Sequence, residues 1–126
     1  MPSERQRLGA KGEDMAVRWY LDRGYVLVAR NWRCRRGELD VVVRRGSLLV
    51  VCEVKTRSSS AYGAPLESVT ALQQRRVRAA TVLLLRELRS GDGDEHFSRH
   101  AWAPVVVRFD VASVLEGEIE VLEQAF

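Results

Sequence analysis

Lysine is scarce in this chain of 126 residues, because only Lys11 and Lys55 stand among its 20 basic residues. Cysteine is equally rare, with two residues, and aromatic residues make up 7%. The two cysteines, Cys34 and Cys52, lack the CxxC or CxxH spacing of metal or redox motifs. We therefore expect isolated, reduced thiols in a cytoplasmic protein, with Cys52 acting as a small buried hydrophobic residue.

Long apolar runs are absent as well. No stretch approaches the length of a membrane-spanning helix, and residues 1–7 lack the apolar core of a signal peptide. Apolar residues make up 46% and charged residues 29%, which is ordinary for a soluble globular protein. The length predicts one domain over residues 1–126, with a polar and mobile connection at residues 90–103, and it predicts no contact with a membrane.

Positive charge is concentrated, although the net charge is only +3. Residues 30–45 contain six arginines and two acids, whereas residues 109–126 contain five acids and no basic residue. This asymmetry favours an oriented contact with a polyanion such as nucleic acid. The alternative is that the arginines only keep the surface soluble. The candidate nucleic-acid-binding residues are Arg33, Arg35, Arg36, Arg57, Arg75 and Arg78.

Hydrophobic periodicity predicts an α/β chain. The expected elements are a helix at 3–21, strands at 25–30, 38–43 and 48–55, a helix at 70–89, a strand at 104–111 and a short last strand at 118–122. Gly9 and Gly12 lower the helical propensity of the first helix, so we expect both to pack closely against the sheet.

The two apolar runs on either side of residues 44–47 predict a β-hairpin. With a loop of two or four residues, paired positions sum to 91, which sets Asp40 opposite Val51 and Glu38 opposite Glu53. Because side chains alternate along a strand, Glu38, Asp40, Glu53 and Lys55 then share one face. A loop of three residues would move Asp40 to the other face.

An acid followed by Glu53-Val54-Lys55 is a pattern typical of metal-dependent phosphodiesterases. Two carboxylates can hold a hard divalent cation, which prefers oxygen ligands. Lysine adds a compact ammonium group, and its use at position 55 is informative in a chain that otherwise uses arginine. The alternative interpretation is a salt bridge between Glu53 and Lys55 at the end of a strand.

The chain resembles the YraN family of small bacterial proteins, which is usually assigned to the PD-(D/E)XK, or restriction-endonuclease-like, superfamily. The resemblance spans nearly the whole chain and rests on residues 9–16, 29–33, 36–40, 51–57, 63–65, 68–70, 108–111, 119–120 and 125–126. Its most specific part is Gly-Glu-Leu-Asp followed by Glu-Val-Lys-Thr-Arg. It implies a central mixed β-sheet flanked by helices in the order αβββαβ, to which the strand at 118–122 is an addition.

The resemblance also implies roles for individual residues. Asp40 and Glu53 match the two metal-binding acids of the superfamily and Lys55 matches its catalytic lysine, while Glu13 matches a helical acid that some branches add to the metal site. The implied cofactor is Mg²⁺ or Mn²⁺. Glu38 and Gln73 are candidate supporting residues. Glu38 could instead pair with Arg36 or Arg57, and Gln73, where the family usually has lysine, could form a helix capping box with Thr70.

These observations predict a divalent-metal-dependent nuclease that hydrolyses phosphodiester bonds in DNA, with RNA as the second choice and with branched or repair and recombination intermediates among the candidate substrates. Cutting a duplex requires two active sites, which makes a homodimer plausible. The alternative is a catalytically inactive nucleic-acid-binding module or an adaptor with a nuclease fold.

Overall fold

The computed structural model describes residues 1–57, 69–90 and 106–126. Their elements follow the order α1 (Glu4–Leu21), β1 (Val26–Cys34), β2 (Gly37–Arg45), β3 (Leu48–Arg57), α2 (Ala71–Ser90), β4 (Val106–Leu115) and β5 (Glu118–Leu122). The expected α/β class and the order helix, three strands, helix, strand are confirmed, and β5 confirms the short last strand.

All the strands form one sheet with the spatial order β1-β2-β3-β4-β5. Strands β3 and β4 are parallel, and the other neighbouring pairs are antiparallel, so the sheet is mixed as expected. A parallel pair needs a crossover connection, and α2 lies in that connection between β3 and β4.

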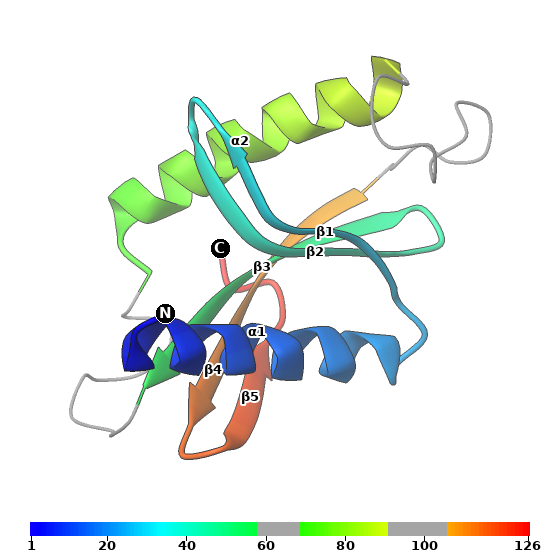
Figure 1. The fold of residues 1–126 in the computed structure, drawn as a ribbon. Helices are drawn as coiled ribbons and strands as arrows, with labels where there is room; N and C mark the ends of the chain where they lie inside the picture. Colours follow the sequence, from blue (N-terminus) through cyan, green and yellow to red (C-terminus); the bar gives the residue numbers. More distant parts are fainter. Residues whose placement is uncertain (58–68, 91–105) are drawn as a thin grey trace.

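The two helices lie on opposite faces of the sheet, which passes between them in Figure 1. On one face, Ala16 and Tyr20 of α1 pack with Val50 and Cys52 of β3, among other residues. On the other face, α2 packs on the intervening positions of β3, such as Val51. This alternation places Cys52 in the core on the α1 side, where it is fully buried as expected.

Strand β2 pairs with two partners over different lengths. Its pairing with β3 runs from Arg45 opposite Leu48 to Val41 opposite Cys52 and ends there. Its pairing with β1 continues for four more residues, to Gly37 opposite Cys34. Residues 37–40 therefore leave β3 together with the end of β1. We call residues 32–40 the β1–β2 arm, and the gap between this arm and residues 53–57 of β3 the fork.

The register of the β2–β3 hairpin differs from the expected one. Paired positions sum to 93 rather than 91, because the loop consists of Gly46 and Ser47, and both Arg44 and Arg45 remain in the strand. Gly46 has a φ of 60°, which a tight hairpin turn requires and glycine adopts without strain. The pairs Asp40 with Val51 and Glu38 with Glu53 were therefore wrong. The sum stays odd, so the face assignment is unaffected.

Helix α1 approaches β3 most closely at Gly12. A Cβ atom at this position would lie 1.9 Å from the Thr56 hydroxyl oxygen, so only glycine fits without displacing the strand or its side chain. The expectation of close packing is therefore confirmed for Gly12. It was wrong for Gly9, where a Cβ would meet no atom of the described residues within 4 Å apart from the backbone of its own helix.

Some expected elements have other limits or lie outside the described residues. The first strand extends to Cys34, so the basic turn is reduced to Arg35 and Arg36, and the fourth strand extends to Leu115. The connection at 90–103 lies outside the described residues except for Ser90, which ends α2. No helix within residues 1–57, 69–90 and 106–126 is both long and apolar enough to cross a membrane.

Candidate metal and phosphodiester site

The fork brings the two predicted metal-binding acids together. Asp40 is the first β2 residue beyond the last β2–β3 pair, and continuing the same register would set Glu53 opposite it. Asp40 Oδ2 accepts a hydrogen bond from the Val54 backbone N–H at 2.9 Å. The carboxylate of Asp40 thus ties the two strands together at the point where their backbone pairing ends.

A cavity of about 490 Å³ opens at the fork, between the arm, β3 and the first turns of α2. We call it the acid cavity. Its polar lining residues are Glu38, Asp40, Glu53, Lys55, Gln73 and Arg76. The structure therefore brings Asp40, Glu53 and Lys55 to one cavity, on the α2 side of the sheet and away from the α1-side cluster that contains Cys52.

Burial makes both acids of the pair unusually weak acids. Desolvation, opposed by the Val54 hydrogen bond and assisted by the charge of Glu13, raises the pKa of Asp40 to about 6. Desolvation and the neighbouring charge of Asp40 raise the pKa of Glu53 to about 8. Two carboxylates in one partly buried place cannot both ionise cheaply without a nearby positive charge. The pair therefore favours a bound cation or a retained proton.

Glu53 has a further property of a metal ligand. Its side chain is buried, with 8% of the residue exposed, and its Oε1 atom has no hydrogen-bond partner among the described residues. A buried carboxylate oxygen without a partner is costly unless something else binds it. A divalent cation coordinated by oxygen would satisfy this atom, so the residues present fit a metal ion.

Among the described residues, Asp40 and Glu53 have no third side chain placed beside them as a metal ligand. Within the described parts of the chain, no group of three or more His, Cys, Asp or Glu side chains has an arrangement that could hold a metal ion. Two carboxylates suffice for Mg²⁺, which usually keeps several of its waters. The site is thus compatible with a hydrated ion held by two side chains.

Glu13 lies beside the pair, outside the lining of the acid cavity. Its Oε1 accepts a hydrogen bond from Asn31 Nδ2 at 3.0 Å and lies 3.5 Å from the Arg30 guanidinium. The charge of Glu13 nevertheless contributes to the raised pKa of Asp40, which places it within electrostatic reach. Asn31 has a φ of 51° inside β1, an uncommon conformation for a residue other than glycine.

The two predicted supporting residues have identifiable partners. Glu38 lies 3.6 Å from Arg33, with 41% of its side chain exposed, so it pairs with an arginine other than Arg36 or Arg57. Gln73 forms the capping box with Thr70, with both reciprocal hydrogen bonds at 3.2 Å. Gln73 also lines the acid cavity, so capping the helix does not remove it from the site.

The predicted nucleic-acid-binding arginines fall into separate groups. Arg35 and Arg36 are exposed at the turn of the arm, and Arg33 is exposed on the adjoining strand. On α2, Arg75 is exposed, whereas the Arg78 guanidinium lies over the Phe109 ring at 4.6 Å from its centroid. Arg78 therefore also takes part in the packing of α2 against β4.

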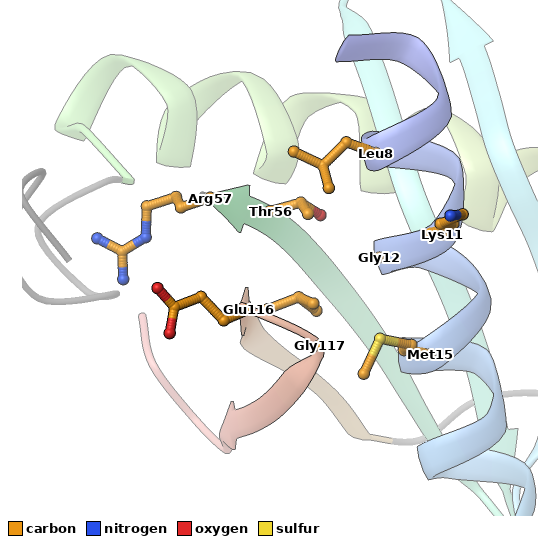
Figure 2. Close-up of a pocket in the computed structure, with 9 residues that line it drawn as sticks. Leu8, Lys11, Gly12, Met15, Thr56, Arg57, Glu116 and Gly117 are labelled. Carbon is orange, nitrogen blue, oxygen red and sulfur yellow. The ribbon is translucent and has the colours of Figure 1, made fainter. Parts of the chain in front are cut away.

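Arg57 belongs to a different cavity, shown in Figure 2, on the α1 side of the sheet. This cavity of about 400 Å³ has an apolar wall of Leu8, Met15 and Val114 and also includes Glu116 of the β4–β5 turn. Figure 2 shows the Arg57 and Glu116 side chains extending in the same direction, away from α1. Arg57 also donates a hydrogen bond to Ser113 Oγ at 3.2 Å. The structure does not bring Arg57 into the acid cavity.

Sequence reasoning missed Arg76 as a residue of the acid cavity. Its neighbour Arg75 was selected because it lies on an arginine-rich stripe of the helix. Adjacent helical positions point about 100° apart, and of the two arginines only Arg76 lines the acid cavity. The apolar contacts of Val77 with the sheet were the available signal for orienting α2, and they place Arg76 on the side facing the arm.

Comparison with known proteins identifies the family of this chain. The model of the uncharacterised protein family UPF0102 matches residues 12–114. A UPF0102 protein of Acidothermus cellulolyticus is 45% identical over 113 residues, covering 90% of this chain and 84% of that protein. One from Rhodococcus jostii is 43% identical over 124 residues, covering 94% and 95%, and one from Nocardioides is 55% identical over 74 residues, covering 59% and 60%. The chain belongs to the family UPF0102, which is the YraN family.

Proposed function

We propose that this protein is a divalent-metal-dependent nuclease that hydrolyses phosphodiester bonds in DNA. The observation that carries the proposal is the pair of Asp40, half-buried, and Glu53, buried, at the fork, with Lys55 in the same cavity. The raised pKa values of both acids and the unpartnered Glu53 Oε1 support it, because these features are costly for a site with only a structural role.

Asp40 and Glu53 would hold Mg²⁺ or Mn²⁺, with Glu13 contributing through water. When bound, such an ion lowers the pKa of a coordinated water and polarises a phosphoryl oxygen. The protein fixes the two carboxylates through the Asp40–Val54 hydrogen bond and through the burial of Glu53. Zinc sites in proteins are built mainly from Cys and His side chains, whereas Mg²⁺ accepts one or two carboxylates.

Lys55 would act on the substrate from the β3 side of the cavity. It stands two residues after Glu53, so both side chains extend from the same face of the strand. Its ammonium group would orient the attacking water or stabilise the negative charge that develops on the phosphoryl oxygens. For this role the Lys55 ammonium must lie close to the reacting phosphate. A Lys55 that only paired with Glu53 would not place its charge there.

The choice of nucleic acid as the substrate rests on the positive charge of the exposed arginines. The exposed arginines at the turn of the arm lie on an element that borders the acid cavity, and arginine binds phosphate oxygens with two parallel hydrogen bonds. We propose DNA before RNA, a cytoplasmic location, and a homodimer for cutting both strands of a duplex. Branched or repair intermediates are the first substrates to test.

A cleavage assay tests this proposal. Purified protein is incubated with Mn²⁺ or Mg²⁺ and a panel of single-stranded, duplex, flapped and four-way-branched DNA and RNA substrates. We expect cleavage of at least one DNA substrate, abolished by chelator and by Asp40→Asn. Strongly salt-dependent binding to the panel without metal binding and without cleavage would instead identify a nucleic-acid-binding module.

A further inference from the structure

Arg76 occupies the α2 wall of the acid cavity. It lies in the second turn of the helix, where α2 passes Gly37, next to the turn of the arm. A Cβ atom on Gly37 would lie 3.6 Å from both the Cβ and the backbone oxygen of Arg76, so the arm passes close to α2 there. The Arg76 side chain therefore starts beside the arm.

Arg76 also keeps its charge available. In the described parts of the chain, no acidic side chain lies within 4.0 Å of its guanidinium. Other arginines near the site are engaged: Arg33 pairs with Glu38 at 3.6 Å, and Arg30 contacts the acids of α1. The acid cavity thus combines the Asp40–Glu53 carboxylate pair on its strands with a guanidinium on its helix that no described acid neutralises.

An anionic substrate needs such a group. The carboxylates of Asp40 and Glu53 repel a phosphodiester that enters the cavity, and this repulsion must be offset by positive charge on the walls. A guanidinium offers a planar fork of donors that matches two oxygens of one phosphate, whereas the ammonium of Lys55 acts as a point charge. The two cations therefore suit different tasks within one cavity.

We propose that Arg76 is a substrate-binding residue that holds the phosphate of the reacting phosphodiester by two hydrogen bonds against the α2 wall. This proposal deepens the proposed nuclease function and rests on it for the nature of the substrate. It assigns to Arg76 a local role at one phosphate, in contrast to the diffuse attraction supplied by surface arginines such as Arg35 and Arg75.

Arg75 provides a matched control, because it is adjacent in sequence, exposed, and absent from the lining of the acid cavity. The probe is a thymidine dinucleotide, which carries a single phosphodiester and therefore senses the general field of the protein only weakly. Its affinity is measured by NMR titration, in chelator and in Mg²⁺, for the wild type and for Arg75→Ala, Arg76→Ala and Arg76→Lys. Thermal unfolding of each variant checks that the fold is retained.

We expect Arg76→Ala to lower the affinity for the dinucleotide at least tenfold, Arg76→Lys to restore part of it, and Arg75→Ala to change it less than twofold. Equal effects of Arg75→Ala and Arg76→Ala, full affinity in Arg76→Ala, or no binding by the wild type in either condition would each overturn the assignment. Mn²⁺ binding and DNA cleavage by the wild type are measured separately, so they decide the nuclease proposal independently. Cleavage with unchanged dinucleotide affinity in Arg76→Ala would reject only the role of Arg76.

Discussion

Asp40 and Val54 are joined by a hydrogen bond of 2.9 Å at the first position beyond the last backbone pair of β2 and β3. The Asp40 carboxylate accepts an N–H that a continued antiparallel ladder would give to a backbone carbonyl of β2. The same side chain therefore closes the end of the sheet and faces the acid cavity. A substitution at Asp40 affects both tasks unless the new side chain can still accept this hydrogen bond.

Asparagine meets that condition, because its carbonyl oxygen can accept the Val54 N–H while its charge is absent. We expect Asp40→Asn to leave the free energy of unfolding of the metal-free protein unchanged or slightly higher, since the repulsion from Glu53 disappears. Metal binding and cleavage should be abolished. Calorimetric titration with Mn²⁺ measures metal binding, and urea unfolding measures stability.

The control for this substitution is Glu38→Gln, which also removes an acid from the acid cavity. The Glu38 side chain is 41% exposed and paired with Arg33. It should retain Mn²⁺ binding within a few-fold of the wild type. Equal and negligible Mn²⁺ heats for the wild type and Asp40→Asn would refute a metal site at the fork.

The raised pKa values of Asp40 and Glu53 predict how stability depends on pH. In the unfolded chain both acids ionise near their ordinary pKa values of 3.8 and 4.5, whereas in the folded metal-free protein they retain protons up to about pH 6 and 8. Between about pH 4 and 8 the folded state binds more protons, so this pair makes the free energy of unfolding fall as the pH rises. The decrease should be on the order of a few kcal/mol.

Urea unfolding of the wild type and Glu53→Gln at pH 5 and pH 8 isolates this effect, because glutamine cannot ionise. The wild type should lose more stability than Glu53→Gln between the two pH values. Saturating Mn²⁺ should stabilise the wild type most at pH 8, where the carboxylates are ionised. If the free energy of unfolding of the wild type instead rises relative to that of Glu53→Gln between pH 5 and pH 8, the pKa values of the pair are not raised by folding.

Lys55 is expected to act on the reaction more than on metal binding. Lys55→Ala should bind Mn²⁺ within a few-fold of the wild type and cleave DNA on the order of 100-fold more slowly, because removing an electrostatic interaction with the transition state typically costs that much. Single-turnover cleavage and Mn²⁺ calorimetry separate the two effects. If Lys55 only forms a salt bridge with Glu53, its removal should lower stability modestly, and the metal should have no effect on either variant.

The exposed arginines of the arm predict a different signature. Replacing Arg35 and Arg36 with alanine should lower the affinity for all DNA sequences alike and reduce the salt dependence of binding by roughly one unit of slope for each phosphate that the variant no longer binds. Fluorescence anisotropy at several salt concentrations measures both. Alanine at Arg5 and Arg7, which are exposed in the first turns of α1, gives the same change in net charge as a control. Equal effects of the two double variants would show that only net charge matters.

The face on which the acids lie could be predicted from the sequence, whereas the fork could not. Alternation along a strand has a period of two, so any even loop length places Asp40 and Glu53 on one side. The register was wrong because the turn is confined to Gly46 and Ser47, and nothing local prevents two arginines from continuing the strand. After Val41, β2 separates from β3 and the arm passes close to α2, which brings together residues such as Gly37 and Arg76 that are far apart in sequence.

The environment of Glu13 shows a second limit of sequence reasoning. Its place on the first helix could be predicted, but its partners Arg30 and Asn31 lie on a strand whose backbone turns into positive φ at Asn31. Asparagine tolerates this conformation better than most residues, yet an asparagine within a strand pattern gives no sequence signal for it. Only the fold reveals that Asn31 holds the carboxylate of Glu13 beside the acid pair.

The contact between α1 and β3 leads to the last prediction, which concerns the scaffold of the site. Gly12→Ala places a methyl group 1.9 Å from the Thr56 hydroxyl oxygen, one residue after Lys55, and should lower the free energy of unfolding by about 1–3 kcal/mol as an overpacked position does. Gly9→Ala is the matched control, because among the described residues its methyl group meets no atom within 4 Å beyond its own helix backbone, and alanine favours the helix by about 0.5–1 kcal/mol. Urea unfolding should therefore shift the two variants in opposite directions.

Because the displaced strand carries Glu53 and Lys55, Gly12→Ala should also weaken Mn²⁺ binding, whereas Gly9→Ala should leave it unchanged. Equal stability of the two variants would show that α1 does not approach β3 as closely as this geometry requires.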